Sequence, residues 1–291
     1  METILIATDF SSAARCATKY GFELSKALNA KVILFTAYQM PSLHPESLVY
    51  LPTTDLEKLS YQQLADEAER FDSHATVRLE THCLQGPVAE AILSVATQYD
   101  VSYIILGMKQ SVKELRRFFG STITLLTKKS SIPLIVVPEG VQFNDVKKIA
   151  FASDINSGDD VSILDPLKKI AVTFNSQVSI VRVIKRREDD AAERLLKSER
   201  LDWYFTCLNH SFEYLSNDNV ARSLNTFVEE NAANLVAVIP HEHTFIERLF
   251  TRSITKELIF QSHVPLLILL DKKKDDFVAD VFTAENAYTI Y

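Results

Sequence analysis

Apolar residues form short, nearly continuous runs along this chain, and the runs alternate with segments in which apolar residues recur every three or four positions. Continuous runs are typical of strands buried on both faces of a parallel sheet, and the spaced pattern is typical of amphipathic helices. In the first half the continuous apolar runs lie at 4–8, 31–38, 102–107 and 133–138. A run at 75–85 alternates between apolar and polar residues and indicates an edge strand. The helical segments lie near 11–28, 54–70, 87–100 and after 120. The order β-α-β-α-β-α-β-α-β predicts a doubly wound α/β layer.

The second half repeats this order. Its apolar runs lie near 148–153, 177–184, 210–215, 234–239 and 265–270, and its helical segments near 160–174, 188–206, 219–231 and 253–262. Each half opens on a run that ends in Asp (Asp9, Asp154) and closes on a run that begins with Pro (Pro133, Pro265). A repeat of half the chain predicts two homologous domains rather than a solenoid. We expect two tandem, doubly wound, parallel five-stranded sheets with helices on both faces, at 1–142 and 146–271, then a tail at 272–291. The segment 39–53 is expected to be a surface insertion.

Composition narrows the class of protein. The net charge of −7 disfavours nucleic acid as the main partner, and no apolar run is long enough for a membrane span. Cys16, Cys83 and Cys207 are far apart and form no CxxC pair, which suits a reducing compartment. We therefore expect a cytoplasmic protein. Trp203 is expected to pack within a helix, and the pair His241 and His243 supplies too few ligands for a zinc site, so no metal centre is predicted.

Polar and glycine residues collect where strands of the first half end. They are Asp9, the stretch 107–110, which includes Gly107, Lys109 and Gln110, and the trio Gly120, Ser121 and Thr122. Ligands of open α/β sheets lie beyond the carboxyl ends of the strands, and a helix N-terminus offers N–H groups to phosphate. Residues 109–119 carry four basic side chains against one acidic one. The pattern favours a phosphate-bearing ligand, with a sugar hydroxyl or an amine at Asp9; the alternative is that Asp9 and Ser121 are only helix caps.

Three segments resemble the universal stress protein family: ILIATDFS, GPVAEAILSVATQYDVSYIILG and FFGSTITLLTKKSSIPLIVVP. The resemblance extends over residues 1–271 as a tandem pair of such domains, with a Rossmann-like fold. Nucleotide-binding members have the signature G-x2-G-x9-G-(S/T), which is kept here as Gly107, Gln110, Gly120 and Ser121, with glutamine at the second glycine. Asp9 matches the family aspartate that contacts the nucleotide. The resemblance implies that the first domain binds ATP or another adenine nucleotide, with Mg²⁺ accompanying it.

The second half departs from this signature. Ile239, Glu242 and Arg252 stand at the three glycine positions, and only Ser253 is kept. Pro240 removes an N–H at the entry to the loop, and an arginine at the close-approach position would fill the space of a phosphate oxygen. We therefore expect a degenerate site in the second half, with Asp154 as a helix cap.

Catalytic motifs are absent from the sequence, which contains no GxxxxGK[ST], GxSxG or HExxH. The leading hypothesis is a non-catalytic stress-response module whose first domain binds nucleotide. One alternative is a nucleotide-free scaffold that acts through an unknown protein partner, and another is a slow ATP hydrolase in which Asp9 places Mg²⁺. Domains of this family pair through their last strands, so residues 134–137 and 266–269 are expected to pair antiparallel within the chain. Whether two chains then form a homodimer stays open.

Overall fold

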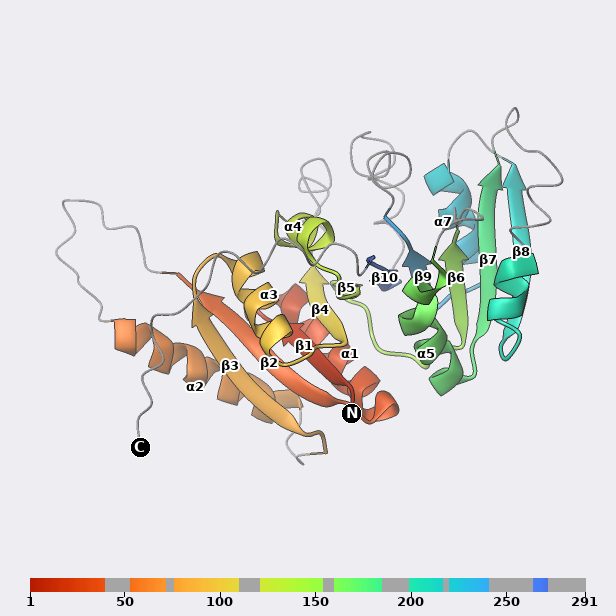
Figure 1. The fold of residues 1–291 in the computed structure, drawn as a ribbon. Coiled ribbons are helices and arrows are strands. Elements are labelled where there is room, and N and C mark those ends of the chain that lie inside the picture. Colours follow the sequence, from red (N-terminus) through yellow and green to blue (C-terminus); the bar gives the residue numbers. More distant parts are fainter. Residues whose placement is uncertain are drawn as a thin grey trace.

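The computed structural model describes residues 1–39, 53–71, 76–109, 121–153, 160–184, 199–216, 220–240 and 264–271. The first half contains β1 (Thr3–Ala7), α1 (Ser12–Leu28), β2 (Lys31–Tyr38), α2 (Thr53–Phe71), β3 (Leu79–Gln85), α3 (Val88–Gln98), β4 (Tyr103–Met108), α4 (Ser121–Lys129) and β5 (Leu134–Pro138). The second half contains β6 (Lys148–Ala152), η1 (Val161–Leu164), α5 (Asp165–Phe174), β7 (Gln177–Ile184), β8 (Asn209–Ser216), α7 (Val220–Glu230), β9 (Leu235–Val238) and β10 (Leu266–Ile268). Figure 1 shows the two halves side by side. No helix within the described ranges is long and apolar enough to cross a membrane.

The ten strands found among the described residues belong to one sheet, in the order β3-β2-β1-β4-β5-β10-β9-β6-β7-β8. Neighbouring strands within each half are parallel. From its outer edge to the centre, each half has the same sequence of strands, since β8-β7-β6-β9-β10 repeats β3-β2-β1-β4-β5. The predicted fold class, a doubly wound α/β architecture with helices on both faces, is therefore confirmed.

The halves meet at the centre of the sheet, where β5 and β10 pair antiparallel. Leu266 lies opposite Val136, and Ile268 lies opposite Leu134. These strands belong to the two segments that the sequence analysis expects to pair, although β10 is shorter than the predicted run. All four side chains are at most 8% exposed, so the seam is part of the core.

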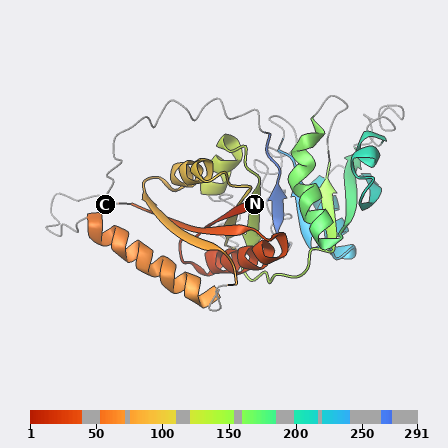
Figure 2. The same cartoon turned by 60° about the horizontal axis from the view of Figure 1, so that its bottom comes forward.

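Side chains of each strand alternate between two buried clusters, one on each face of the sheet. Leu5 belongs to the cluster that includes residues of α3, α4 and α7, whereas Ile4 and Ile6 belong to the cluster that includes residues of α1 and α5. Figure 2 shows α1 and α2 on one side of the strands of the first half and α3 and α4 on the other. Burial on both faces explains why these strands have continuous apolar runs in the sequence.

Contacts on the α1 face also hold the halves together. Phe143, in the segment between the halves, lies 5.0 Å from the Tyr20 ring of α1 and 6.0 Å from the Phe174 ring of α5, between ring centroids. The Tyr103 hydroxyl of β4 donates to the Pro166 carbonyl at 2.9 Å. Burial raises the pKa of Tyr103, so the hydroxyl stays protonated and remains a donor.

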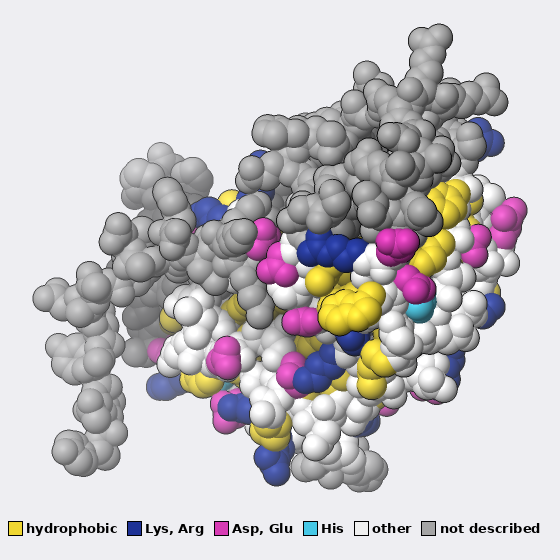
Figure 3. Space-filling view, turned by 45° about the vertical axis from the view of Figure 1, so that its right-hand side comes forward, with side chains coloured by type: hydrophobic (Ala, Val, Ile, Leu, Met, Phe, Trp, Pro, Cys, Tyr) yellow, Lys and Arg dark blue, Asp and Glu magenta, His cyan; other side chains and the backbone are white. Residues whose placement is uncertain are grey.

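The prediction for Trp203 is wrong, because its side chain is 77% exposed. Residues 199–204 are helical, and this segment buries Leu201, Tyr204 and Phe205. Positions 201, 204 and 205 form the i, i+3, i+4 stripe of one helix face, and position 203 falls on another face. Figure 3 shows hydrophobic side chains reaching the surface among charged ones on this side of the molecule. The predicted insertion at 39–53, the helix at 253–262 and the tail lie largely or wholly outside the described residues.

Candidate functional site

The candidate site of the first half lies where the strand order reverses. β1 is flanked by β2 and β4, and Ala7 at the end of β1 pairs with Leu106 of β4. Asp9 therefore follows β1 at the same end of the sheet as Gly107 and Lys109. In an open α/β sheet this is the position at which ligands bind.

A compact turn connects β1 to α1 and places Asp9. The Phe10 N–H donates to the Thr8 hydroxyl at 3.0 Å, and the Ser11 N–H donates to Asp9 Oδ1 at 3.0 Å. Phe10 has a φ of 61°, a left-handed conformation that is uncommon for a bulky residue. The helix cap itself is Ser11, whose hydroxyl accepts from the Ala14 N–H. Asp9 is thus fixed by one carboxylate oxygen while its side chain stays exposed.

Gly107 has a packing role that the sequence analysis did not identify. A Cβ atom added at this position would lie 2.4 Å from both the carbonyl carbon and the carbonyl oxygen of Ala13, and 2.6 Å from Ala14 N. These are backbone atoms of the first turn of α1, so no rotamer change would relieve the contact. The first glycine of the signature therefore lets α1 approach β4 closely, whatever it contributes to a ligand.

Glu139 is a site residue that the sequence analysis missed. Its N–H donates to the Met108 carbonyl at 2.8 Å, and its carboxylate accepts from the Ser12 hydroxyl in the first turn of α1. The next residue, Gly140, donates its N–H to Cys16 Sγ at 3.3 Å. A signal existed in the sequence, because Glu139 directly follows β5, whose carboxyl end lies beside that of β4. The carboxylate makes the N-terminus of α1 unfavourable for phosphate.

The N-terminus of α4 is the better position for phosphate. α4 connects the carboxyl end of β4 to the start of β5, so it begins at the candidate site. Ser121 is its first residue and is exposed, Thr122 is half-buried, and the first turn contains no acidic residue. Lys109 is exposed just beyond β4. Gln110, Gly120 and the rest of the basic loop lie outside the described residues, so the structure places Asp9, Gly107, Lys109, Ser121 and Thr122 only.

The second half differs at the equivalent end of its sheet. Ile239, which follows β9 where Gly107 stands in β4, is 2% exposed, and Pro240 follows it. Asp154 and residues 241–263 lie outside the described part of the chain. Within that part, no three histidine, cysteine or acidic side chains form a group that could hold a metal ion.

Comparisons with known proteins agree with this architecture. Residues 1–138 match the model of the universal stress protein family. The whole chain is similar in structure to a universal stress protein from Archaeoglobus fulgidus DSM 4304, with 15% sequence identity, a TM-score of 0.67 and coverage of 92% of this chain and 96% of that chain. It is also similar to a functionally unknown protein from Pseudomonas aeruginosa PAO1 (9% identity, TM-score 0.55, coverage 94% and 94%) and to the cytoplasmic domain of a prokaryotic cation chloride cotransporter (11% identity, TM-score 0.53, coverage 93% and 95%).

A search among curated proteins finds no match. At these identities, the solved structures establish a shared fold over both halves. The family match applies to the first half.

Proposed function

We propose that this chain is a cytoplasmic, universal-stress-type protein with two such domains, at 1–142 and 146–271, and that the first domain binds ATP or a related adenine nucleotide. For the first domain the family match over residues 1–138 supports the proposal. For the second domain the support is its repeated strand order. In this proposal the protein is a non-catalytic module whose nucleotide occupancy is read by a protein partner.

The observation that carries nucleotide binding is the position of Asp9 beside Gly107 and Lys109 at the point where the strand order reverses. The exposed carboxylate of Asp9 suits a ribose hydroxyl or the adenine amine. Phosphate is expected toward α4, because Lys109 and a helix N-terminus with no acidic residue in its first turn are favourable to an anion. The other side of the site is acidic at Glu139, so the ligand has one preferred orientation. Mg²⁺ would accompany the phosphates.

The first experiment is to denature freshly purified protein and chromatograph the nucleotide that it releases. We expect an adenine nucleotide that is lost in Gly120→Arg, a change that copies the residue of the second half. Lys109→Glu should weaken binding of added ATP by about tenfold, because one cationic contact is replaced by repulsion. Lys58→Glu on α2 has the same change of charge at another exposed lysine and should leave binding unchanged.

A nucleotide-free scaffold is the second candidate, and Glu139 beside the first turn of α1 is the observation that favours it. Protein that releases no nucleotide, and whose thermal unfolding does not respond to millimolar ATP with Mg²⁺, would support the scaffold and overturn nucleotide binding. Slow ATP hydrolysis, the third hypothesis, is tested on the same protein by phosphate release, with Asp9→Asn as the variant expected to abolish it.

A further inference from the structure

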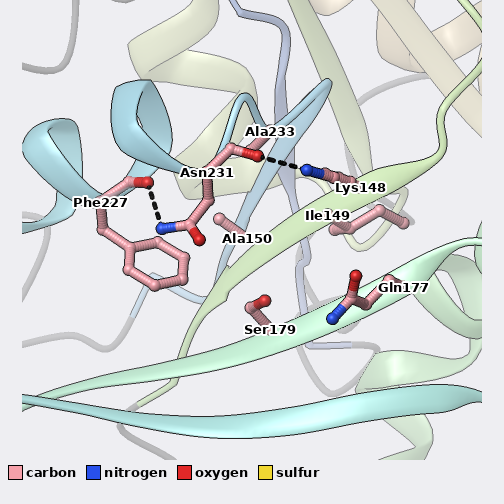
Figure 4. Close-up of a pocket in the computed structure, with 8 residues that line it drawn as sticks. All are labelled: Lys148, Ile149, Ala150, Gln177, Ser179, Phe227, Asn231 and Ala233. Carbon is pink, nitrogen blue, oxygen red and sulfur yellow. Dashed lines mark hydrogen bonds between the residues drawn. The ribbon is translucent and has the colours of Figure 1, made fainter.

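A small polar pocket lies in the second half, at the opposite end of the sheet from the equivalent of the candidate nucleotide site. It opens between the C-terminal turn of α7 and the first residues of β6 and β7, and its volume is about 40 Å³ (Figure 4). It is lined by Lys148, Ile149, Ala150, Gln177, Ser179, Phe227, Asn231 and Ala233. A buried water needs about 10–15 Å³ on this measure, so the space holds roughly three waters or a molecule of a few heavy atoms.

The internal repeat identifies the residues that fill this space in the first half. Leu5 of β1 pairs with Ile33 of β2, and the same pair in the second half is Ala150 of β6 and Ser179 of β7. The register is equivalent, because Lys31 N donates to Glu2 O and Gln177 N donates to Lys147 O, at 2.9 and 2.8 Å. Leu5 and Ile33 are both 0% exposed. Two large apolar side chains are thus replaced by a methyl group and a hydroxymethyl group.

The covering helix changes in the same place. Tyr99 N donates to Val95 O after α3, and Asn231 N donates to Phe227 O after α7, each followed by a residue with a left-handed backbone at position 100 or 232. Tyr99 therefore corresponds to Asn231. Tyr99 packs against the buried cluster of the first half, with the Lys31 ammonium 5.5 Å from its ring centroid. Phe227 is larger than Val95 and returns part of the lost volume, but three smaller side chains still leave the pocket.

The replacements also make the pocket polar. Lys148 Nζ donates to the Asn231 carbonyl at 3.0 Å and stands at the mouth of the pocket. The Asn231 amide nitrogen donates to the Phe227 carbonyl at 2.9 Å, which directs its Oδ1 toward the space in front of Ser179 (Figure 4). Gln177 completes the polar side, and none of the lining residues is acidic. The pocket therefore offers one cation, a hydroxyl and amide groups on one side, with Phe227 and Ala150 as the apolar wall.

We infer that this pocket binds a small hydroxycarboxylate of the size of glycolate, or the hydroxycarboxylate end of a longer molecule. The carboxylate would bind the Lys148 ammonium and the Ser179 hydroxyl, because a charge-assisted hydrogen bond is the strongest contact available there. The ligand hydroxyl would donate to Asn231 Oδ1, which a plain carboxylate would leave unsatisfied. This site is independent of the proposed nucleotide site, since it uses other residues in the other half of the chain.

The test is thermal unfolding of the full chain with glycolate, acetate or glycolamide, each at about 10 mM and at matched ionic strength. Glycolate with a Kd of about 1 mM should raise Tm by about 3 °C. Acetate should raise Tm less, and the neutral glycolamide should not raise it. Lys148→Gln should weaken glycolate binding by about tenfold, because the charged donor is lost. Lys147→Gln removes the neighbouring exposed ammonium, which donates instead to the Phe174 carbonyl, and should leave glycolate binding unchanged.

The combined variant Ala150→Leu with Ser179→Ile restores the pair of the first half and should abolish the glycolate effect. If this variant does not fold, titration calorimetry on Lys148→Gln and Lys147→Gln decides the same question. The inference is overturned if glycolate raises the Tm of neither the parent protein nor Lys147→Gln. It is also overturned if Lys148→Gln binds glycolate as well as Lys147→Gln does. Lys109→Glu must leave the glycolate effect intact, which separates this site from the proposed nucleotide site.

Discussion

Gly107→Ala should destabilise the protein more than an exposed glycine replacement would, because the added methyl group would meet backbone. The nearest atoms, Ala13 C and O, would be 2.4 Å from the new Cβ. Ordinary contacts of this kind are at least about 3.4 Å, so the first turn of α1 would have to move by roughly 1 Å. Overpacking of this size costs about 3 kcal/mol, or about 6–12 °C in Tm for a domain of this length.

Gly21→Ala is the matched control, since Gly21 lies farther along the same helix. Its added Cβ would be 2.5 and 2.9 Å from Cδ1 and Cγ1 of Ile6, so a buried side chain would have to shift, but no backbone atom would. Alanine also favours the helix by about 1 kcal/mol over glycine, which offsets part of this cost, so Gly21→Ala should destabilise the protein less than Gly107→Ala does. Both variants would be compared by urea and thermal unfolding, followed by circular dichroism. Equal stability of Gly107→Ala and the parent protein would refute the close approach of α1 to β4.

Three further predictions concern the seam between the halves, a salt bridge and the cysteines. Val136→Lys places an ammonium at a position that is 0% exposed and paired with Leu266, so it should lower stability by about 3 kcal/mol or more and cause association through the opened strand. A variant with the oligomeric state and the Tm of the parent protein would contradict the pairing. Burial acts to raise the pKa of Glu2, but hydrogen bonds from Lys169 and Ser102 and the Lys169 charge outweigh it, so this pKa is lowered and the contact stabilises the protein above about pH 4.5 and loses that effect as pH falls below it. Lys169→Gln should therefore lower Tm at pH 7, and the difference in Tm from the parent protein should disappear in acid. A difference in Tm that does not depend on pH would argue against the contact. Partial burial raises the pKa of the Cys83 thiol to about 11, so at pH 8 iodoacetamide should modify the exposed Cys207 long before Cys83. Peptide mass spectrometry would measure the two rates, and equal rates would contradict the half-buried position of Cys83.

The sequence was sufficient to predict the fold, for a physical reason. Strand interiors such as Ile4–Ile6 contact helices on both faces, so their side chains must be apolar and their runs are visible without a structure. The edge strand β3 is half-buried, and its alternation was visible too. Trp203 shows the limit of the argument. The sequence predicts its helix, but only the burial of positions 201, 204 and 205 shows that the tryptophan lies on the exposed face.

The candidate site was less predictable because its contacts join distant segments. The sequence motif identified Gly107, but its close approach to Ala13 depends on where α1 lies against β4. Glu139 belongs to no motif, and its contact with Ser12 arises only because β5 ends beside β4. Spacing along the chain identifies groups that share one end of a sheet, whereas the choice among caps, packing contacts and ligands depends on distances between elements.

The two halves diverge at positions that the seam does not constrain. β5, β10 and Phe143 join the halves through apolar contacts, so replacing those side chains would expose core to solvent. Ile239 follows β9, and Ala150 and Ser179 pair between β6 and β7, so none of them belongs to the pairing of β5 with β10. Their replacement of Gly107, Leu5 and Ile33 therefore leaves the seam intact, whether the new residue fills space, as Ile239 does at 2% exposure, or opens a pocket. Side chains at the ends of the strands can therefore differ between the halves without loss of the architecture that both halves share.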